Sequence, residues 1–246
     1  VDVIWRQIYP ISENSTDTEK EGYNGFFPRY ASSAAAQNGT NYAMTETFGV
    51  FSPGLTYDLM RYSLGFQAIR GINILNPMVI SMGRSNVQLA QELPSFTEDQ
   101  IYYKDLSGFN RYLERLSYLT SLGARVCDTA LYFPIHDFWG RLNNNAVANT
   151  FDALGRAMED KQVDFDIIDD DVLQTATGIE EGYIRMGKAA YRHIIIPTKA
   201  YLPDETIYVL ERFVKAGGKV SYTENEAVPA VQIEGSAEGL RAMHRT

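Results

Sequence analysis

Cysteine is nearly absent from this sequence: Cys127 is the only one among 246 residues. An internal disulfide is therefore excluded, and so is a metal site built from several cysteines. Glycine-rich phosphate-binding patterns are missing too. Neither Gly-x-Gly-x-x-Gly nor a Walker-type sequence occurs, so nothing in the chain supports nucleotide binding.

Basic residues are in the minority. Lys and Arg number 22 against 31 Asp and Glu, which gives a net charge of −9. Phosphate backbones need clustered positive charge, so we expect no nucleic-acid partner. No apolar run approaches the roughly 18 residues of a membrane-spanning helix, so we expect no membrane partner either. The apolar fraction of 45% and the charged fraction of 22% are ordinary for a globular protein.

The first half of the chain alternates between strand and helix patterns. We expect strands over residues 2–8, in the segment ending at Glu46, and over residues 73–76. The alanine-rich stretch over residues 29–37 predicts a short helix after the first strand. Apolar residues recur with helical spacing after the second and third strands, from Leu55 to Ile69, with Thr56 as a candidate N-cap, and from Phe109 to Leu119. This order predicts three βα units with parallel strands. A closed (β/α) barrel has eight units, so these three belong either to an open sheet or to the last part of a barrel.

The second half predicts a separate α/β domain. Strands are expected over residues 126–133, 164–168, 193–197 and 219–222, with helices over 147–158 and 203–214. An open parallel sheet of flavodoxin-like type fits this order. We therefore expect two domains, residues 1–123 and 124–246.

Glu46 is the leading candidate for chemistry. It ends an expected strand and precedes a glycine turn and an amphipathic helix, and catalytic groups of (β/α) barrels lie where strands pass into loops. A carboxylate in that place is typical of acid–base or nucleophilic work on a glycosidic bond. The alternative is a solvated loop glutamate. Gln7 and Asn76 end neighbouring strands and could bind sugar hydroxyls, while Trp5 either stacks on a sugar ring or packs in the core.

His136 and Trp139 are the candidates of the second half. They follow the expected strand over 126–133, and ligands of open α/β sheets bind at that end of the strands. A structural role for the histidine remains an alternative. Cys127 opens a strand and does not sit at a strand–helix elbow, so amidotransferase-type hydrolysis is rejected. The acidic run over 164–171 lacks the EF-hand pattern and is interpreted as strand-end and cap carboxylates.

Several segments, in order, resemble one family. They are Asp2–Gln7, Thr45–Gly49, Gln67–Asn73, Leu116–Leu119 and Leu131–Ile135. Together they resemble the C-terminal part of bacterial clan A-type glycoside hydrolases, nearest to the α-L-rhamnosidase-like enzymes. The second domain resembles the amidotransferase-like domain that follows the barrel there and in related β-galactosidases, where it helps trimers form.

The resemblance implies that the chain carries barrel units six to eight of a (β/α)8 barrel. Glu46 would then be the nucleophile or, in an inverting enzyme, the general base, and the general acid would lie upstream of Val1. The sequence leaves retaining and inverting mechanisms open. Relatives often have a histidine after the strand-eight proline, where this chain has Met78, so the sugar preference is uncertain.

The same resemblance implies a carbohydrate substrate, from plant or microbial polysaccharide, and a homo-oligomer through the second domain. No cofactor is expected. Some relatives use calcium, but no ligands for it can be assigned here. The compartment is open, and would be periplasmic or secreted for a bacterial polysaccharide-degrading enzyme. We expect residues 1–246 alone to be inactive. The alternative function is a non-catalytic carbohydrate-binding or oligomerisation module.

Overall fold

The structure is a computed structural model, and its described residues are 2–3, 25–48, 55–78, 80, 96–98, 100–123, 125–140, 145–197, 200–223 and 231–232. Trp5 and Gln7 lie outside this set. The chain divides into two compact units. Unit 1 comprises Val1–Thr16, Pro28–Ser32 and Asn41–Arg125, and unit 2 comprises Asp17–Phe27, Ser33–Thr40 and Val126–Thr246. Residues 33–40 thus group with unit 2, although the sequence places them in the first domain.

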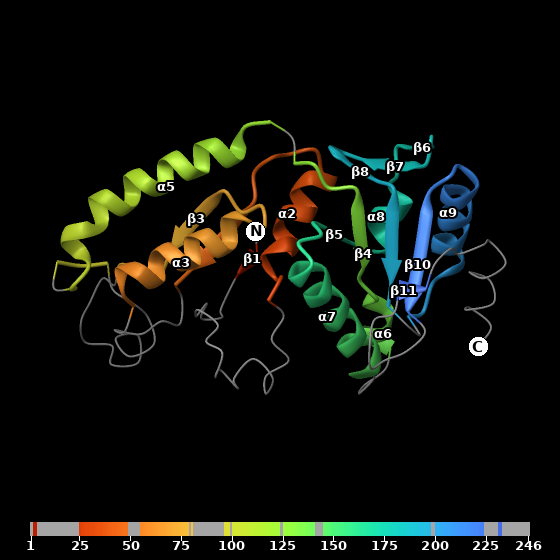
Figure 1. Ribbon diagram of the computed structural model, residues 1–246, viewed down its shortest axis with the longest axis horizontal. Coiled ribbons are helices and arrows are strands. Elements are labelled where there is room, and N and C mark those ends of the chain that lie inside the picture. The colour runs from red at the N-terminus through yellow and green to blue at the C-terminus, as the bar shows by residue number, and fades with distance from the viewer. Residues whose placement is uncertain are drawn as a thin grey trace. The chain divides into compact units, whose positions relative to one another are not determined.

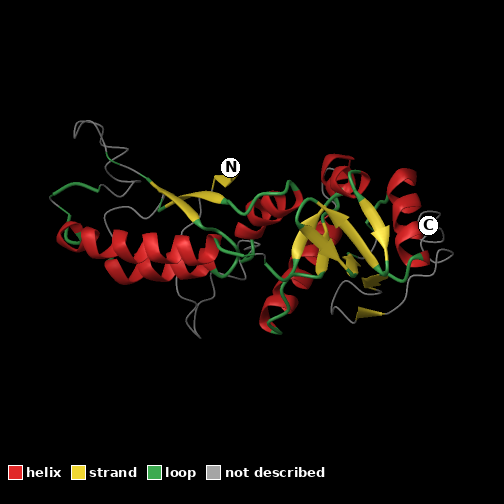
Figure 2. Cartoon of the chain, turned by 90° about the horizontal axis from the view of Figure 1, so that it is seen from above, coloured by secondary structure: helices red, strands yellow, loops and turns green. Residues whose placement is uncertain are grey.

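Unit 1 contains three parallel strands in the order β1 (Asp2–Val3), β2 (Met44–Thr47) and β3 (Ile74–Pro77). Helices α3 (Tyr57–Ala68) and α5 (Leu106–Ser121) pack against each other, with the short η2 turn (Tyr103–Asp105) entering α5. Strands and helices form two layers (Figures 1 and 2). The three parallel βα units expected from the sequence are confirmed for the described residues.

Helix α3 is fixed at both ends by its sequence. Thr56 caps it by accepting a hydrogen bond from the Leu59 amide at 3.3 Å, as the N-cap pattern predicts. Gly71 follows the helix with φ +91°, a left-handed conformation that favours glycine. The apolar face of the helix enters a core shared with α5 and the strand end; this core comprises Phe48, Leu55, Met60, Leu64, Tyr102 and Phe109.

Unit 2 is built on a five-stranded sheet in the order β11-β10-β9-β4-β5. The strands are β4 (Thr129–Tyr132), β5 (Asp166–Ile168), β9 (His193–Ile196), β10 (Lys219–Thr223) and the antiparallel β11 (Val231–Gln232). The parallel strands, numbered by chain order, read 4-3-1-2 across the sheet. This is the expected flavodoxin-like arrangement, with its topological switch point between β4 and β9.

The residues of these strands alternate between two covered faces. Ala130, Tyr132, Ile194 and Ile196 enter one core with residues of α8 (Asp170–Gln174) and α9 (Asp204–Lys215). Helix α7 (Asn145–Asp160) packs against β4. The short α6 (Ile135–Gly140) follows β4 directly. Continuous burial of β4 and β9 explains their almost wholly apolar sequences.

The sequence analysis missed a three-stranded antiparallel meander. It consists of β6 (Gly178–Glu180), β7 (Tyr183–Met186) and β8 (Ala189–Tyr191). Glu181 and Gly182 form a two-residue turn in which both φ angles are positive, at 52° and 77°. Such a turn matches the twist of a hairpin. The Glu181-Gly182 pair was the available signal of a turn. Strands of three or four residues are too short to show a clear alternating pattern.

The second half of helix α2 (Pro28–Gln37) lies against the edge of the unit 2 sheet. Ser33 Oγ accepts from the Ile167 amide at 2.8 Å, and Gln37 Nε2 donates to the Ile167 carbonyl at 2.7 Å. Both groups belong to edge strand β5, whose free backbone would otherwise be unpaired. Asp166 accepts from Ser33 and from Tyr191 Oη, at 3.1 and 2.9 Å. Burial, together with the Asp166 charge, raises the pKa of Tyr191, so its hydroxyl remains a donor.

Candidate functional site

A buried hydrogen-bond network sets the orientation of strand β2. Thr45 and Thr47 are almost fully buried, and both bond to Gln67 of α3, which is also fully buried. Gln67 Nε2 additionally donates to the Ser63 carbonyl at 3.3 Å. Successive side chains of a strand point to opposite faces. With its threonines turned toward α3, β2 must present Glu46 on the face away from that helix.

Asn76 is the register partner of Glu46 on the neighbouring strand. Partners in a parallel ladder share a face and lie roughly 4.8 Å apart between strands. Glu46 is half-buried and Asn76 is exposed. A carboxylate and a carboxamide therefore stand side by side on the helix-free face, near the carboxyl ends of their strands.

The start of β3 is tied to the start of β2 by Asn73. Its Oδ1 accepts from the Ala43 amide at 3.1 Å, and its Nδ2 donates to the Asn41 carbonyl at 2.6 Å. Because Asn73 is buried, these bonds exclude a one-residue slip between the strands. The pairing of Glu46 with Asn76 is thus fixed from the start of the ladder.

Phe48 follows the strand in an unusual backbone conformation. Its φ of 72° is in the left-handed region, which a bulky residue seldom adopts. The ring is 2% exposed and lies near Phe96 and Phe109, with ring centroids 6.0 and 6.3 Å away. Aromatic packing therefore holds the strained turn that ends the strand carrying Glu46.

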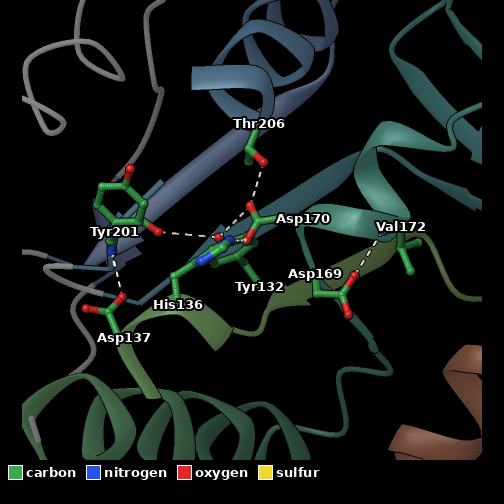
Figure 3. Close-up of polar contacts among 8 residues, drawn as sticks. All are labelled: Tyr132, His136, Asp137, Asp169, Asp170, Val172, Tyr201 and Thr206. Atoms are coloured by element: carbon green, nitrogen blue, oxygen red, sulfur yellow. Dashed lines mark hydrogen bonds and ion pairs between the residues drawn. The ribbon is translucent and has the colours of Figure 1, made fainter. Parts of the chain in front are cut away.

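A second constellation lies at the carboxyl ends of β4 and β5 in unit 2 (Figure 3). Asp170, 3% exposed, accepts from Tyr132 Oη at 2.8 Å and from Thr206 Oγ1. Its other oxygen lies 3.3 Å from Nε2 of His136. Burial, followed by the Asp170 charge, raises the pKa of Tyr132, so this phenol stays a hydrogen-bond donor.

Aromatic side chains surround the His136 imidazole. The rings of Trp139 and Tyr201 lie 5.7 and 5.9 Å from it, at interplanar angles of 84° and 76°. Trp139 is 72% exposed, while the Tyr201 amide is held by the Asp137 carboxylate at 2.7 Å. Asp137 and Asp170, both drawn in Figure 3, belong to different elements, α6 and α8.

The sequence-predicted residues fall into two groups. Glu46 and Asn76 are neighbours in unit 1, and His136 and Trp139 are neighbours in unit 2. Trp5 and Gln7 lie outside the described residues. The roles of all six remain predictions. Asp169, interpreted as a cap carboxylate, does cap α8 by accepting from the Val172 amide at 2.9 Å.

Sequence reasoning did not identify Tyr132, Tyr201 and Thr206 as parts of the unit 2 constellation. Their partner Asp170 appeared only as one member of an acidic run. The four residues come from separate elements, so no spacing in the sequence joins them. The one usable signal was position, since Tyr132 lies near the end of one expected strand and Tyr201 follows the end of another.

Neither a metal cluster nor a membrane helix is found in the described part of the chain. Among those residues, no group of three or more His, Cys, Asp or Glu could hold a metal ion. None of the described helices is long and apolar enough to cross a bilayer.

Comparisons with known proteins identify glycoside hydrolases of similar fold. No protein-family model matches the sequence, and no curated protein matches it. A rhamnosidase from Novosphingobium sp. PP1Y superposes with a TM-score of 0.58 at 15% identity, over 90% of this chain and 21% of its own.

Two β-galactosidases are similar to the same degree. One is a catalytic mutant of a GH42 β-galactosidase from G. stearothermophilus, with a TM-score of 0.58, and the other is from Rahnella sp. R3, with a TM-score of 0.56. Each is 15% identical and matches 88% of this chain and 32% of its own. The chain thus spans a fifth to a third of the chains it matches. At this identity the likeness establishes a shared α/β fold.

Proposed function

We propose that this chain is part of a glycoside hydrolase and that Glu46 supplies one of its two catalytic carboxylates. The observation that carries the proposal is the orientation of Glu46. It lies near the carboxyl end of a parallel strand, on the face that α3 leaves uncovered. In a (β/α) barrel the helices cover the outside and the active site lies at the strands' carboxyl ends.

Asn76 extends the proposed site. As the register partner of Glu46, its carboxamide can donate to a sugar hydroxyl and accept from another. We propose Gln7 and Trp5, which follow β1 in the sequence, as further substrate contacts. The comparisons support a sugar substrate at the level of class, because the structures of similar fold are a rhamnosidase and β-galactosidases.

The chemistry follows from what a lone carboxylate can do. In a retaining enzyme Glu46 attacks the anomeric carbon, the bond to the leaving oxygen breaks, and a second carboxyl group protonates that oxygen. In an inverting enzyme Glu46 takes a proton from a water that attacks instead. The two carboxyl groups would be about 5–5.5 Å apart in the first case and about 6.5–9.5 Å in the second. We propose no cofactor for either route.

The first prediction tests Glu46 in the form of the protein that contains the complete barrel. Glu46→Gln should lower kcat on aryl rhamnosides or galactosides by several orders of magnitude, because the amide cannot act as nucleophile or base. Glu114→Gln, an exposed change on α5, is the matched control and should leave kcat unchanged. Thermal unfolding should be the same for both variants.

Two readouts test the role of Glu46, and the first separates the two mechanisms. Proton NMR of the first-formed product anomer distinguishes retention from inversion. Azide should restore turnover to Glu46→Gly as a glycosyl azide, of opposite anomeric configuration to the substrate in a retaining enzyme. Near-normal kcat in Glu46→Gln would remove Glu46 from the mechanism.

The alternative function is a carbohydrate-binding or oligomerisation module without catalysis. The exposure of Trp139 on unit 2 favours it, since a large exposed aromatic ring suits a binding surface. Sugar binding or assembly by a protein that shows no turnover in its complete form would support this alternative over the enzyme.

A further inference from the structure

The chemistry proposed for Glu46 assigns no step to the unit 2 constellation, which is built like a ligand site. We propose that His136, Trp139 and Tyr201 form a self-contained binding site for one neutral pyranose ring. The choice of a sugar rests on the proposed function. The site itself rests on unit 2 alone, since every residue of it belongs to that unit.

The position is the first argument. His136 follows β4, and Tyr201 follows β9, the two adjacent strands between which the chain order reverses. Ligands of open α/β sheets bind outside the carboxyl ends of the strands at this switch point. The reason is that the loops there diverge to opposite sides of the sheet and leave the strand ends accessible.

The anchoring of His136 is the second argument. Asp170 is buried, and its Oδ1 is occupied by the hydroxyls of Tyr132 and Thr206. Its Oδ2 faces only the imidazole Nε2 among the described residues, at 3.3 Å. The two hydroxyl groups hold the buried carboxylate, and its free oxygen lies beside the imidazole at ion-pair distance without a hydrogen bond to it. The second ring nitrogen, Nδ1, is a further polar group that can bond a hydroxyl group of a ligand.

Charge selects a neutral ligand. Burial raises the pKa of Tyr132, and the charges of three carboxylates, those of Asp170, Asp137 and Asp169, raise it further, so these carboxylates lie within electrostatic reach of that phenol. A phosphate or carboxylate ligand would be repelled by them. A quaternary ammonium is also disfavoured, because the Asp170 charge is buried and already engaged by hydroxyl groups and an imidazole.

The aromatic rings supply the remaining chemistry. Trp139 and Tyr201 both stand nearly perpendicular to the imidazole and are 72% and 47% exposed. An indole face packs well against the C–H face of a pyranose, while its hydroxyls need polar partners at the rim. His136 Nδ1 supplies such a partner beside the two rings.

The experiment is a binding titration of the 246-residue chain with methyl α-L-rhamnopyranoside and methyl β-D-galactopyranoside. The chain contains two tryptophans, so Trp5→Phe leaves Trp139 as the sole indole reporter. We expect saturable change in Trp139 fluorescence with at least one glycoside. Ligand-detected saturation-transfer NMR on the chain with Trp5 intact gives a second readout.

Trp139→Ala and His136→Ala should each weaken binding about tenfold, the loss expected for one stacking or hydrogen-bonding partner. Both are surface-accessible changes, and circular dichroism checks the fold. Tyr208→Ala is the matched control: it is exposed on α9 but lies about 200° around the helix from Thr206. It should leave binding unchanged.

Three results would overturn the proposal. The first is glycoside binding that Trp139→Ala does not weaken. The second is binding of tetramethylammonium or inorganic phosphate without binding of either glycoside. The third is a Trp139→Ala change that alters only the oligomeric state, measured by sedimentation velocity. Loss of turnover in Glu46→Gln with no sugar bound at Trp139 would leave the proposed function intact while rejecting this site.

Discussion

At the scale of single residues, Phe48 combines backbone strain with core packing. A left-handed φ costs a bulky residue of order 1–3 kcal/mol, and the buried ring offsets that cost through its contacts with other aromatic rings. Strained backbone conformations cluster at functional sites, and this one lies directly after the candidate catalytic strand. The ring and the backbone can be tested separately by two truncations.

Phe48→Ala should destabilise unit 1 by roughly 3–5 kcal/mol, as for other buried Phe→Ala changes. Phe48→Gly removes the same ring but also relieves the strained φ. Glycine is usually worse than alanine in a folded chain, by about 0.4–1 kcal/mol. Here we expect the glycine variant to be at least as stable as the alanine variant in urea unfolding. A clearly less stable glycine variant would show that residue 48 does not hold a positive φ in solution.

His193 gives the fold a pH dependence. It opens β9, and its Nε2 lies 2.7 Å from Ser221 Oγ. Burial, and then the Lys219 charge, lower its pKa below the ordinary value of 6.5, against a smaller opposite effect of Asp128. Above that value the ring is neutral in the folded and unfolded chain alike. As the pH falls through 6.5, the unfolded chain takes up the proton first, so stability decreases.

His193→Gln should therefore reduce the loss of stability between pH 7.5 and pH 5.5, since glutamine does not titrate and can still bond to Ser221. The measurement is the urea midpoint of both proteins at the two pH values. The carboxylates contribute equally to the two proteins, so their effect cancels in the comparison. Equal losses in the two proteins would mean that His193 titrates normally in the fold.

At the scale of secondary-structure elements, the sequence predicted the long or strongly patterned segments. Leu55 to Ile69 has clear helical periodicity, and α3 lies there with Thr56 as its cap. The apolar run Ile194–Ile196 lies in the central strand β9. Each of these signals is local: a cap, a stripe, or an apolar run between turns.

What the sequence could not predict depends on distant partners. Ser33 and Gln37 read as part of an alanine-rich helix, and only the fold pairs them with Ile167 at the sheet edge, some 130 positions away. Asp170 meets Thr206 in the same way, across 36 positions. The pairing of Glu46 with Asn76 was accessible because parallel strand ends share one edge, which topology alone implies.

The turn between β7 and β8 leaves no room for an added methyl group. Gly187 has φ +54°, and an added Cβ would come within 2.3 Å of the Gln37 carbonyl oxygen and 2.6 Å of the Gly39 amide nitrogen. Both are backbone atoms, so moving them aside would cost substantial free energy. The meander is also tied to α2 by the Lys188 amide, which donates to the Ala36 carbonyl at 2.9 Å.

Gly187→Ala should therefore lower stability severely, by about 3 kcal/mol or more, since the clash adds to backbone strain. Gly108→Ala is the control: it lies in helix α5, and no atom stands within 4 Å of its added Cβ. That change should stabilise by about 0.5–1 kcal/mol. Calorimetry of both variants checks the contrast. A mild effect at residue 187 would mean that the meander packs less closely on α2.

At the scale of the whole molecule, the helix-free face of unit 1 sets the behaviour of the chain. Glu46 and Asn76 share that face with Met44 and Ile74, their strand neighbours two positions earlier, and Ile74 is 40% exposed. In the proposed barrel this face would line the interior. In the 246-residue chain the face and the strand edges offer surfaces on which copies can associate, despite the net charge of −9.

We expect the purified 246-residue chain to show no turnover on aryl glycosides and to self-associate through this face. A glycosidase needs two carboxyl groups flanking the bond, and Glu46 is the one candidate in the chain. Ile74→Lys should reduce self-association in sedimentation velocity, because it places a charge on the uncovered face. Ile69→Lys, at a position 74% exposed at the end of α3, is the matched control and should not.

Turnover that Glu46→Ala abolishes would mean that the chain holds its own acid. The first residues to test would then be Asp58, exposed in the first turn of α3, and Glu13. Association unaffected by Ile74→Lys but lost in Trp139→Ala would instead place the contact in unit 2.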